Sequence, residues 1–247
     1  MLSWVRQALP TSSLAANAKP EAVWYSHNGH LLKWHYPIGL LYDMFTESSD
    51  APTMPPADLP QLTGALPLPW PITVHLQSFP HDKLLPSPTS STLQTLYMAQ
   101  CKEAEFMRTG STKKIMNLSK NDQSQLWQGF VEHTFEKYWR IGQPLVLGDD
   151  GFVPKHIPFR LYTRLGAVVQ IPISLSELGE TTTIQEAVTY IINPDRYLSG
   201  NAPVTGTSTP LDCRVLVHGI LVDPATPLLW LYRHFSYPDT FLHAVLL

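Results

Sequence analysis

The segment HIPFRLYTR, residues 156–164, has the alternating pattern of a β-strand. Two sets of side chains share it, Ile157, Phe159 and Leu161 on one face and Pro158, Arg160 and Tyr162 on the other. This period of two predicts a half-buried strand. A turn around Gly166 leads to VVQIPISL, residues 168–175, which predicts a second strand. The two strands are predicted to form a hairpin, and this hairpin is the starting point for the prediction of the fold.

The elements that follow the hairpin complete a recognisable order. TTTIQEAVTYIINP, residues 181–194, predicts a helix that begins with a Thr183–Glu186 capping box and ends at Asn193-Pro194. CRVLVHGI, residues 213–220, predicts a strand, Thr226-Pro227 begins a short helix, and FLHAVLL, residues 241–247, predicts the last strand. Hairpin, helix, strand, short helix and strand predict an α+β domain with the β-grasp plan of ubiquitin. The apolar end, in place of a glycine-glycine tail, indicates that the chain is not itself a conjugated modifier.

The middle third of the chain predicts helices. LQTLYMAQCKEAEFM, residues 93–107, forms one helix that Ser90 and Ser91 can cap, and Asp122 with Gln125 can cap a second over SQLWQGFVEHTFEKYW, residues 124–139. The apolar face of the second comprises Trp127, Phe130, Val131, Thr134 and Tyr138. Together these segments predict a small helix-rich domain.

The first third of the chain shares with the last third the order of an apolar helix followed by a strand. VWYSHNGHLLKWHYP, residues 23–37, is strand-like, IGLLYDMF, residues 38–45, predicts a short apolar helix, and ITVHLQSF, residues 72–79, predicts a strand. Seven prolines between Pro52 and Pro71 predict a loop, because proline lacks the amide donor and clashes with the preceding helical turn.

Composition argues against several classes of function. The net charge of −3 opposes nucleic-acid binding, and no apolar run is long enough to span a membrane. Two distant cysteines, Cys101 and Cys213, give neither a disulfide framework nor a zinc site, so a soluble cytosolic protein is expected. His27 and His30 flank Asn28-Gly29, a turn signal, so we expect no metal site there. No GxSxG elbow is present to indicate a Ser-His-Asp triad, and without a glycine-rich phosphate loop no cofactor is expected.

Two potential nucleophiles stand side by side in MAQCKEAEF, residues 98–106. Helical phase places Cys101 on the apolar stripe and turns Lys102 roughly 100–160° away from that stripe, into solvent. A thiol on an apolar stripe loses reactivity because burial raises its pKa. The alternative, a thiol enzyme that uses Cys101 with His133 or His218 as base, requires an exposed thiol near an imidazole.

Several segments, in the same order, resemble the autophagy protein 5 family. They are LKWHYPIGLLYD (32–43), PWPITVHLQSFP (69–80), CKEAEF (101–106), QLWQGF (125–130), IPFRLY (157–162), VHGI (217–220) and SYPDTFLHAVLL (236–247). The likeness covers about residues 24–247. It implies two ubiquitin-like β-grasp domains flanking a helix-rich domain, over residues 1–80 with a proline-rich insert at 51–71, 88–142 and 152–247.

The resemblance also implies a function. In that family one lysine before Glu-Ala, here Lys102, is joined by an isopeptide bond to the ubiquitin-like autophagy protein 12. The conjugate binds autophagy protein 16 non-covalently in a groove that contacts all three domains. With the conjugating enzymes for autophagy proteins 12 and 8, it promotes lipidation of autophagy protein 8 with phosphatidylethanolamine. A non-catalytic cytoplasmic protein, peripheral at the preautophagosomal structure membrane, is therefore expected.

One departure from the family pattern concerns the first domain. The family opens with a β-hairpin before the helix that matches the first twenty residues, and Met1 stands at about the start of that helix. The comparison predicts that the first ubiquitin-like domain is incomplete. It leaves a second alternative open, a variant that binds partners without being conjugated.

Overall fold

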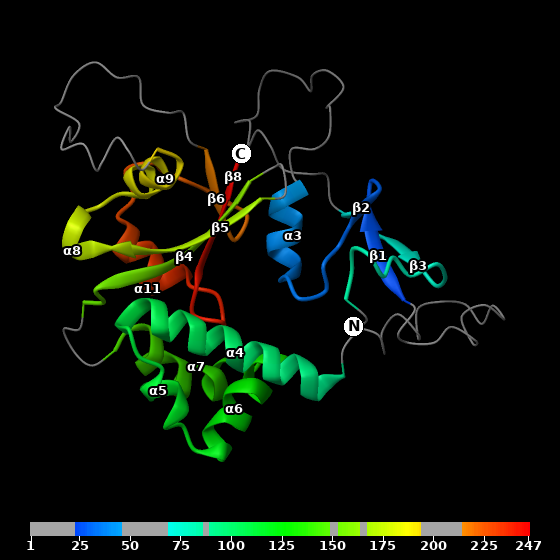
Figure 1. Ribbon diagram of the computed structural model, residues 1–247, viewed down its shortest axis with the longest axis horizontal. Helices are drawn as coiled ribbons and strands as arrows, with labels where there is room; N and C mark the ends of the chain where they lie inside the picture. The colour runs from blue at the N-terminus through cyan, green and yellow to red at the C-terminus, as the bar shows by residue number, and fades with distance from the viewer. Residues whose placement is uncertain (1–22, 46–68, 86–88, 149–152, 164–166, 194–213) are drawn as a thin grey trace.

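The computed structural model describes residues 23–45, 69–85, 89–148, 153–163, 167–193 and 214–247. Figure 1 shows a large sheet with helices on both faces, a helical bundle below it, and a small sheet beside helix α3. The N-terminal helix implied by the resemblance, most of the proline-rich insert, the turn at Gly166, and Cys213 lie outside the described residues.

The last third forms a five-stranded β-grasp sheet. Its elements are β4 (His156–Thr163), β5 (Val168–Ser174), α8 (Leu175–Leu178), α9 (Ile184–Ile192), β6 (Val215–Val217), β7 (Ile220–Val222), α11 (Leu228–Phe235) and β8 (Leu242–Leu246). The strand order is β5-β4-β8-β6-β7, in which β4 and β8 are parallel and the other pairs antiparallel. The β-grasp prediction is confirmed for this domain, and so is the Thr183–Glu186 capping box.

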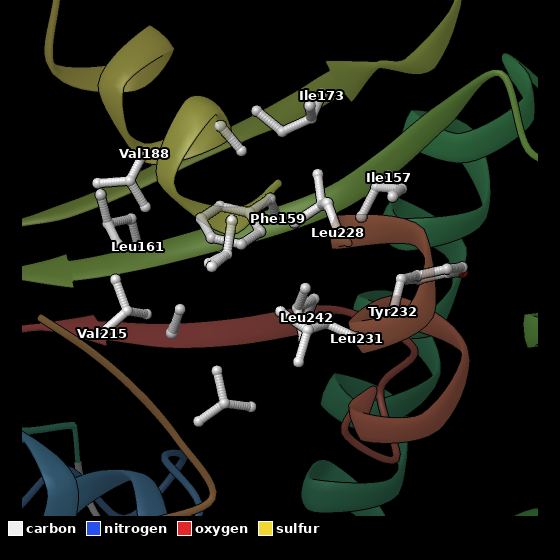
Figure 2. Packing of buried hydrophobic residues seen from close by; sticks show 14 of the residues in the cluster. Ile157, Phe159, Leu161, Ile173, Val188, Val215, Leu228, Leu231, Tyr232 and Leu242 are labelled. Carbon is white, nitrogen blue, oxygen red and sulfur yellow. The ribbon is translucent and has the colours of Figure 1, made fainter. Parts of the chain in front are cut away.

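The core of this domain lies between the sheet and two helices. Figure 2 shows Phe159 of β4 and Leu242 of β8 facing Val188 of α9 and Leu228 of α11. All four side chains are completely buried. Each such side chain contributes on the order of 1.5–3 kcal/mol to folding relative to an exposed position.

The segment CRVLVHGI is not one strand, as predicted, but part of a hairpin. His218 and Gly219 occupy the turn between β6 and β7 with φ of 51° and 77°. Apolar residues continue on both sides of His218-Gly219, and this pair is not among the strongest turn dipeptides, so the segment was interpreted as a single strand. Positive φ at both residues is the geometry of a type I′ two-residue hairpin turn.

The strand β4 is buried on both faces, so the prediction of a half-buried strand was wrong. Pro158, Arg160 and Tyr162 face away from the α9 core but are buried as well. Helices α4 and α3 pack over that second face of the sheet. The second face of β4 is therefore buried by the other two domains, and the local alternation of residues contains no signal of such contacts.

The middle third is a bundle of α4 (Ser90–Thr109), α5 (Lys113–Met116), α6 (Lys120–Val131) and α7 (Phe135–Val146). The predicted single helix over 124–139 is two helices, because the chain reverses at His133, whose φ is 55°. The predicted caps also moved: Thr89 caps α4 and Ser119 caps α6. Lys120, Asn121 and Asp122 are already helical, so Asp122 lies in the first turn of α6 and not at its cap.

The first third contributes β1 (Trp24–His27), β2 (His30–Leu31), α3 (Ile38–Phe45) and β3 (Thr73–His75), with strand order β2-β1-β3. The predicted strand over 23–37 is a hairpin whose turn is Asn28-Gly29, with φ of 48° and 79°. In both outer thirds a left-handed turn is followed, after the same number of residues, by a proline and an eight-residue helix, α3 or α11. The similarity in element order expected from the sequence thus extends to the geometry of the hairpin turns.

Candidate functional site

Helix α4 carries the two residues that the sequence singled out. Cys101 is completely buried, and burial raises the pKa of its thiol to about 12. Lys102 is partly exposed, where full exposure was predicted, and its ammonium makes no hydrogen bond or ion pair with any residue that the structure describes. The predicted separation of a buried thiol from an accessible amine is therefore present.

The thiol-enzyme alternative fails at its first requirement. Besides its burial, the Sγ of Cys101 is directed at a carbonyl oxygen, that of Pro238, 3.9 Å away. His133 is exposed in the turn between α6 and α7, and His218 directs its Nε2 to the carbonyl oxygen of Phe235 at 3.0 Å. Neither imidazole is brought to the thiol, so the three residues do not form a catalytic group.

A pocket of about 150 Å³ opens where the three domains meet. The first domain contributes residues 34–37 to its lining. The bundle contributes Leu93, Leu96, Tyr97, Gln100, Trp127 and Phe130, and the second ubiquitin-like domain contributes Arg160, Tyr162, Tyr237, Pro238, Asp239 and His243. We call this the interdomain pocket; its walls are largely aromatic and apolar, with a polar floor.

The polar floor is a network around Asp239. Arg160 Nη1 donates to its Oδ2 at 3.1 Å, and His243 Nε2 lies 2.9 Å from the same oxygen. Burial alone raises the pKa of Asp239, yet His243 and Arg160 outweigh burial and hold it below its ordinary value. The Tyr162 hydroxyl lies 2.9 Å from His243 Nδ1 and ends the network. The polar side chains of the floor are thus hydrogen-bonded to one another and are not left unpaired to bind a ligand.

The segment SYPD, residues 236–239, follows α11 on the way to β8, and it also holds the bundle. The carbonyl oxygen of Pro238 accepts hydrogen bonds from Tyr97 at 3.0 Å and from Tyr138 at 3.3 Å. A tyrosine on each of two predicted helices was visible in the sequence, but nothing local indicated their common acceptor.

The first domain docks on the second through helix α3. Leu40 packs with Tyr162, Leu216, Tyr237 and Val245. Asp43 is buried beside this cluster, and its Oδ2 accepts a 2.9 Å hydrogen bond from the backbone amide of Gly219. Burial raises the pKa of Asp43 to about 6 despite that bond. This docking brings residues 34–37 to the edge of the interdomain pocket.

Within the described ranges, no group of three or more histidine, cysteine, aspartate or glutamate side chains could hold a metal ion. His27 and His30 pair across the hairpin turn, and their rings contact Phe45. Of the helices that the structure describes, none combines the length and apolar character needed to cross a membrane.

Comparison with known families matches three adjoining models. Residues 1–76 match the UblA domain of autophagy protein ATG5, residues 90–148 its alpha-helical bundle region, and residues 156–246 its UblB domain. These matches together span most of the chain.

Individual relatives agree with the family models. Autophagy protein 5 of Phaeosphaeria nodorum is 30% identical over 91% of this chain and 75% of its own length. Autophagy protein 5 of Drosophila melanogaster is 31% identical over 93% of this chain and 75% of its own length. The crystal structure of Kluyveromyces marxianus Atg5 has the same fold, with a TM-score of 0.66 at 22% identity over 91% of this chain and 73% of that chain.

Proposed function

Because the chain belongs to the autophagy protein 5 family, we propose that it is the conjugation scaffold that this membership implies, with Lys102 as acceptor of autophagy protein 12. The observation that carries the proposal is the arrangement of helix α4. Lys102 lies on the outer side of α4, whereas Leu96 and Gln100 of the same helix line the interdomain pocket. At about 100° per residue, Lys102 stands roughly 120–160° from these two side chains. A modifier and a second partner therefore have separate faces of one helix.

The chemistry at Lys102 needs no catalytic group on this chain. A conjugating enzyme that carries autophagy protein 12 as a thioester supplies the electrophile. The neutral amine of Lys102 attacks the carbonyl carbon, the C–N bond forms, the C–S bond breaks, and the enzyme cysteine leaves as the thiol with the proton of the amine. This chain then acts as a non-catalytic subunit, which agrees with the buried, unreactive Cys101.

The interdomain pocket is the proposed site for autophagy protein 16. Its volume, about 150 Å³, is close to that of a cavity that holds one benzene-sized group and is small for a cofactor. Aromatic and apolar walls suit one or two anchor side chains of an amphipathic helix. The complex would then promote lipidation of autophagy protein 8 with phosphatidylethanolamine, as a cytoplasmic assembly peripheral to the preautophagosomal membrane.

Reconstitution with the conjugating enzymes tests the proposal. We expect a covalent adduct with autophagy protein 12 from the unaltered chain and from Lys113→Arg, an exposed lysine of the same bundle, but none from Lys102→Arg. Leu96→Glu is expected to keep the adduct and to lose autophagy protein 16. An adduct that persists in Lys102→Arg would show that the acceptor is another lysine. If the unaltered chain forms no adduct but binds autophagy protein 16, it is the non-conjugated binding variant.

A further inference from the structure

A closed ring of hydrogen bonds lies directly beside Lys102. Arg160 of β4 donates to Gln170 of β5 at 2.6 Å and to Glu103 of α4 at 3.2 Å. Gln170 in turn donates to the other carboxylate oxygen of Glu103 at 2.7 Å. Both oxygens of Glu103 are therefore engaged by the second ubiquitin-like sheet. The ring fixes one turn of α4 to a strand pair whose own register sets Arg160 opposite Gln170.

Both sequence neighbours of Lys102 are thus held, on two sides of the helix. Cys101 is buried in the bundle and faces Pro238, and Glu103 is tied to β4 and β5. The amine of Lys102 itself has no hydrogen-bonding or ionic partner among the described side chains. Because both neighbours are held, the backbone of Lys102 is fixed in direction, which limits the orientations in which its unpaired amine meets an incoming group.

The ring is not needed to dock α4. The helix is already attached to the second domain by Arg108, which bonds to Tyr232 at 2.7 Å, and by Tyr97, which bonds to Pro238. Arg108 and Tyr232 are buried, whereas the side chain of Glu103 is 50% exposed. Ion pairs at such exposure contribute little to stability. What Glu103 adds is the local orientation of the turn that presents Lys102.

We propose that Glu103, held by Arg160 and Gln170, is a positioning residue for acceptance of a ubiquitin-like modifier by Lys102. The role rests on the proposed function of Lys102 and deepens it. Glu103 takes no part in bond making or proton transfer. Its effect is to limit the directions from which the thioester carbonyl meets the amine.

Single-turnover adduct formation, with the preformed thioester of autophagy protein 12 on its conjugating enzyme, tests this role in the full chain. Glu103→Ala should lower the rate constant at saturating thioester about five- to twenty-fold, since small misplacements of reacting groups have large kinetic effects. The thermal unfolding midpoint and the pH midpoint of the reaction should stay unchanged. Gln170→Ala should give a smaller loss, and the double variant should be no slower than Glu103→Ala, because both changes open the same ring.

Glu132→Ala is the matched control. Its side chain is also 50% exposed and also makes one ion pair, with Lys137, in the turn between α6 and α7. It should react at the unaltered rate. A Glu103→Ala rate equal to that of the unaltered chain, or a loss accompanied by a lower unfolding midpoint, overturns the positioning role while the Lys102 assignment stands. An unaltered chain that forms no adduct overturns both together.

Discussion

The guanidinium of Arg108 donates a 2.7 Å hydrogen bond to the hydroxyl of Tyr232, and this bond joins the helical bundle to the centre of the second ubiquitin-like domain. Both side chains are buried, and Glu105, one turn earlier on α4, is buried with them as the counter-ion of Arg108. Burial raises the pKa of Tyr232, and Arg108 opposes that rise. The contact is therefore an enclosed polar junction between two apolar cores.

Removal of the Arg108 guanidinium alone should lower the free energy of unfolding far more than removal of both charges of the Arg108–Glu105 pair. Arg108→Met leaves the Glu105 carboxylate buried without a counter-ion, so we expect a loss of about 3–5 kcal/mol in the free energy of unfolding. The double variant Glu105→Gln with Arg108→Met leaves neither charge buried and should lose markedly less than Arg108→Met alone. Urea unfolding followed by tryptophan fluorescence measures both. A single variant within about 1 kcal/mol of the unaltered chain would contradict the buried ion pair.

Helices α6 and α7 approach each other closely at Gly129. A Cβ built there would lie 2.5 Å from the backbone nitrogen of Tyr138, which cannot move without displacing α7. Gly129→Ala should therefore destabilise the bundle by about 1–3 kcal/mol or more. Gly39→Ala is the control, since its Cβ meets nothing within 4 Å in helix α3, and it should be neutral or gain up to about 1 kcal/mol. Equal effects of the two changes on the thermal midpoint would contradict this packing.

Asp43 makes the docking of the first domain depend on pH. Its carboxyl keeps a proton up to about pH 6 in the folded chain, but only to about 3.8 when unfolded. Between these values the folded state binds more protons, so this residue lowers the stability as pH rises from about 4 to 6, by on the order of 1–3 kcal/mol. Asp43→Asn keeps an acceptor for the Gly219 amide and should remove this contribution.

The comparison is made between the two proteins across the pH range, because Asp239 has the opposite dependence. Its lowered pKa contributes stability that is present above the unfolded value and is lost as pH falls. The difference in unfolding free energy between Asp43→Asn and the unaltered chain should grow from pH 4 to pH 7. A constant difference would mean that Asp43 titrates normally in the folded protein.

Much of the fold follows from local signals. The Thr183–Glu186 box, the start of α11 after Thr226-Pro227 and the turn signal of Asn28-Gly29 each have a known physical cause and were recognised in the sequence. The break at His133 could not be predicted, because EHTF, residues 132–135, contains neither glycine nor proline. The reversal of the chain there depends on the close approach of Gly129 to Tyr138.

Some features of the candidate site could likewise be predicted from the sequence, and others could not. Helical phase alone separated Cys101 from Lys102, since both lie on one helix. The resemblance, and not the physics of an accessible lysine, selected Lys102 as acceptor. The ring of Glu103, Arg160 and Gln170 and the interdomain pocket join residues from distant parts of the chain, and no local pattern encodes such contacts.

The three-domain origin of the interdomain pocket has a thermodynamic consequence. Its walls exist only while α3, the bundle and the large sheet are docked together. Any ligand that fills it binds the docked chain in preference to every partly undocked form. By mass action such a ligand adds about 2.7 kcal/mol of stability at a hundredfold excess over its dissociation constant. The cohesion of the three domains thereby becomes a property of the complex and of how much ligand is present.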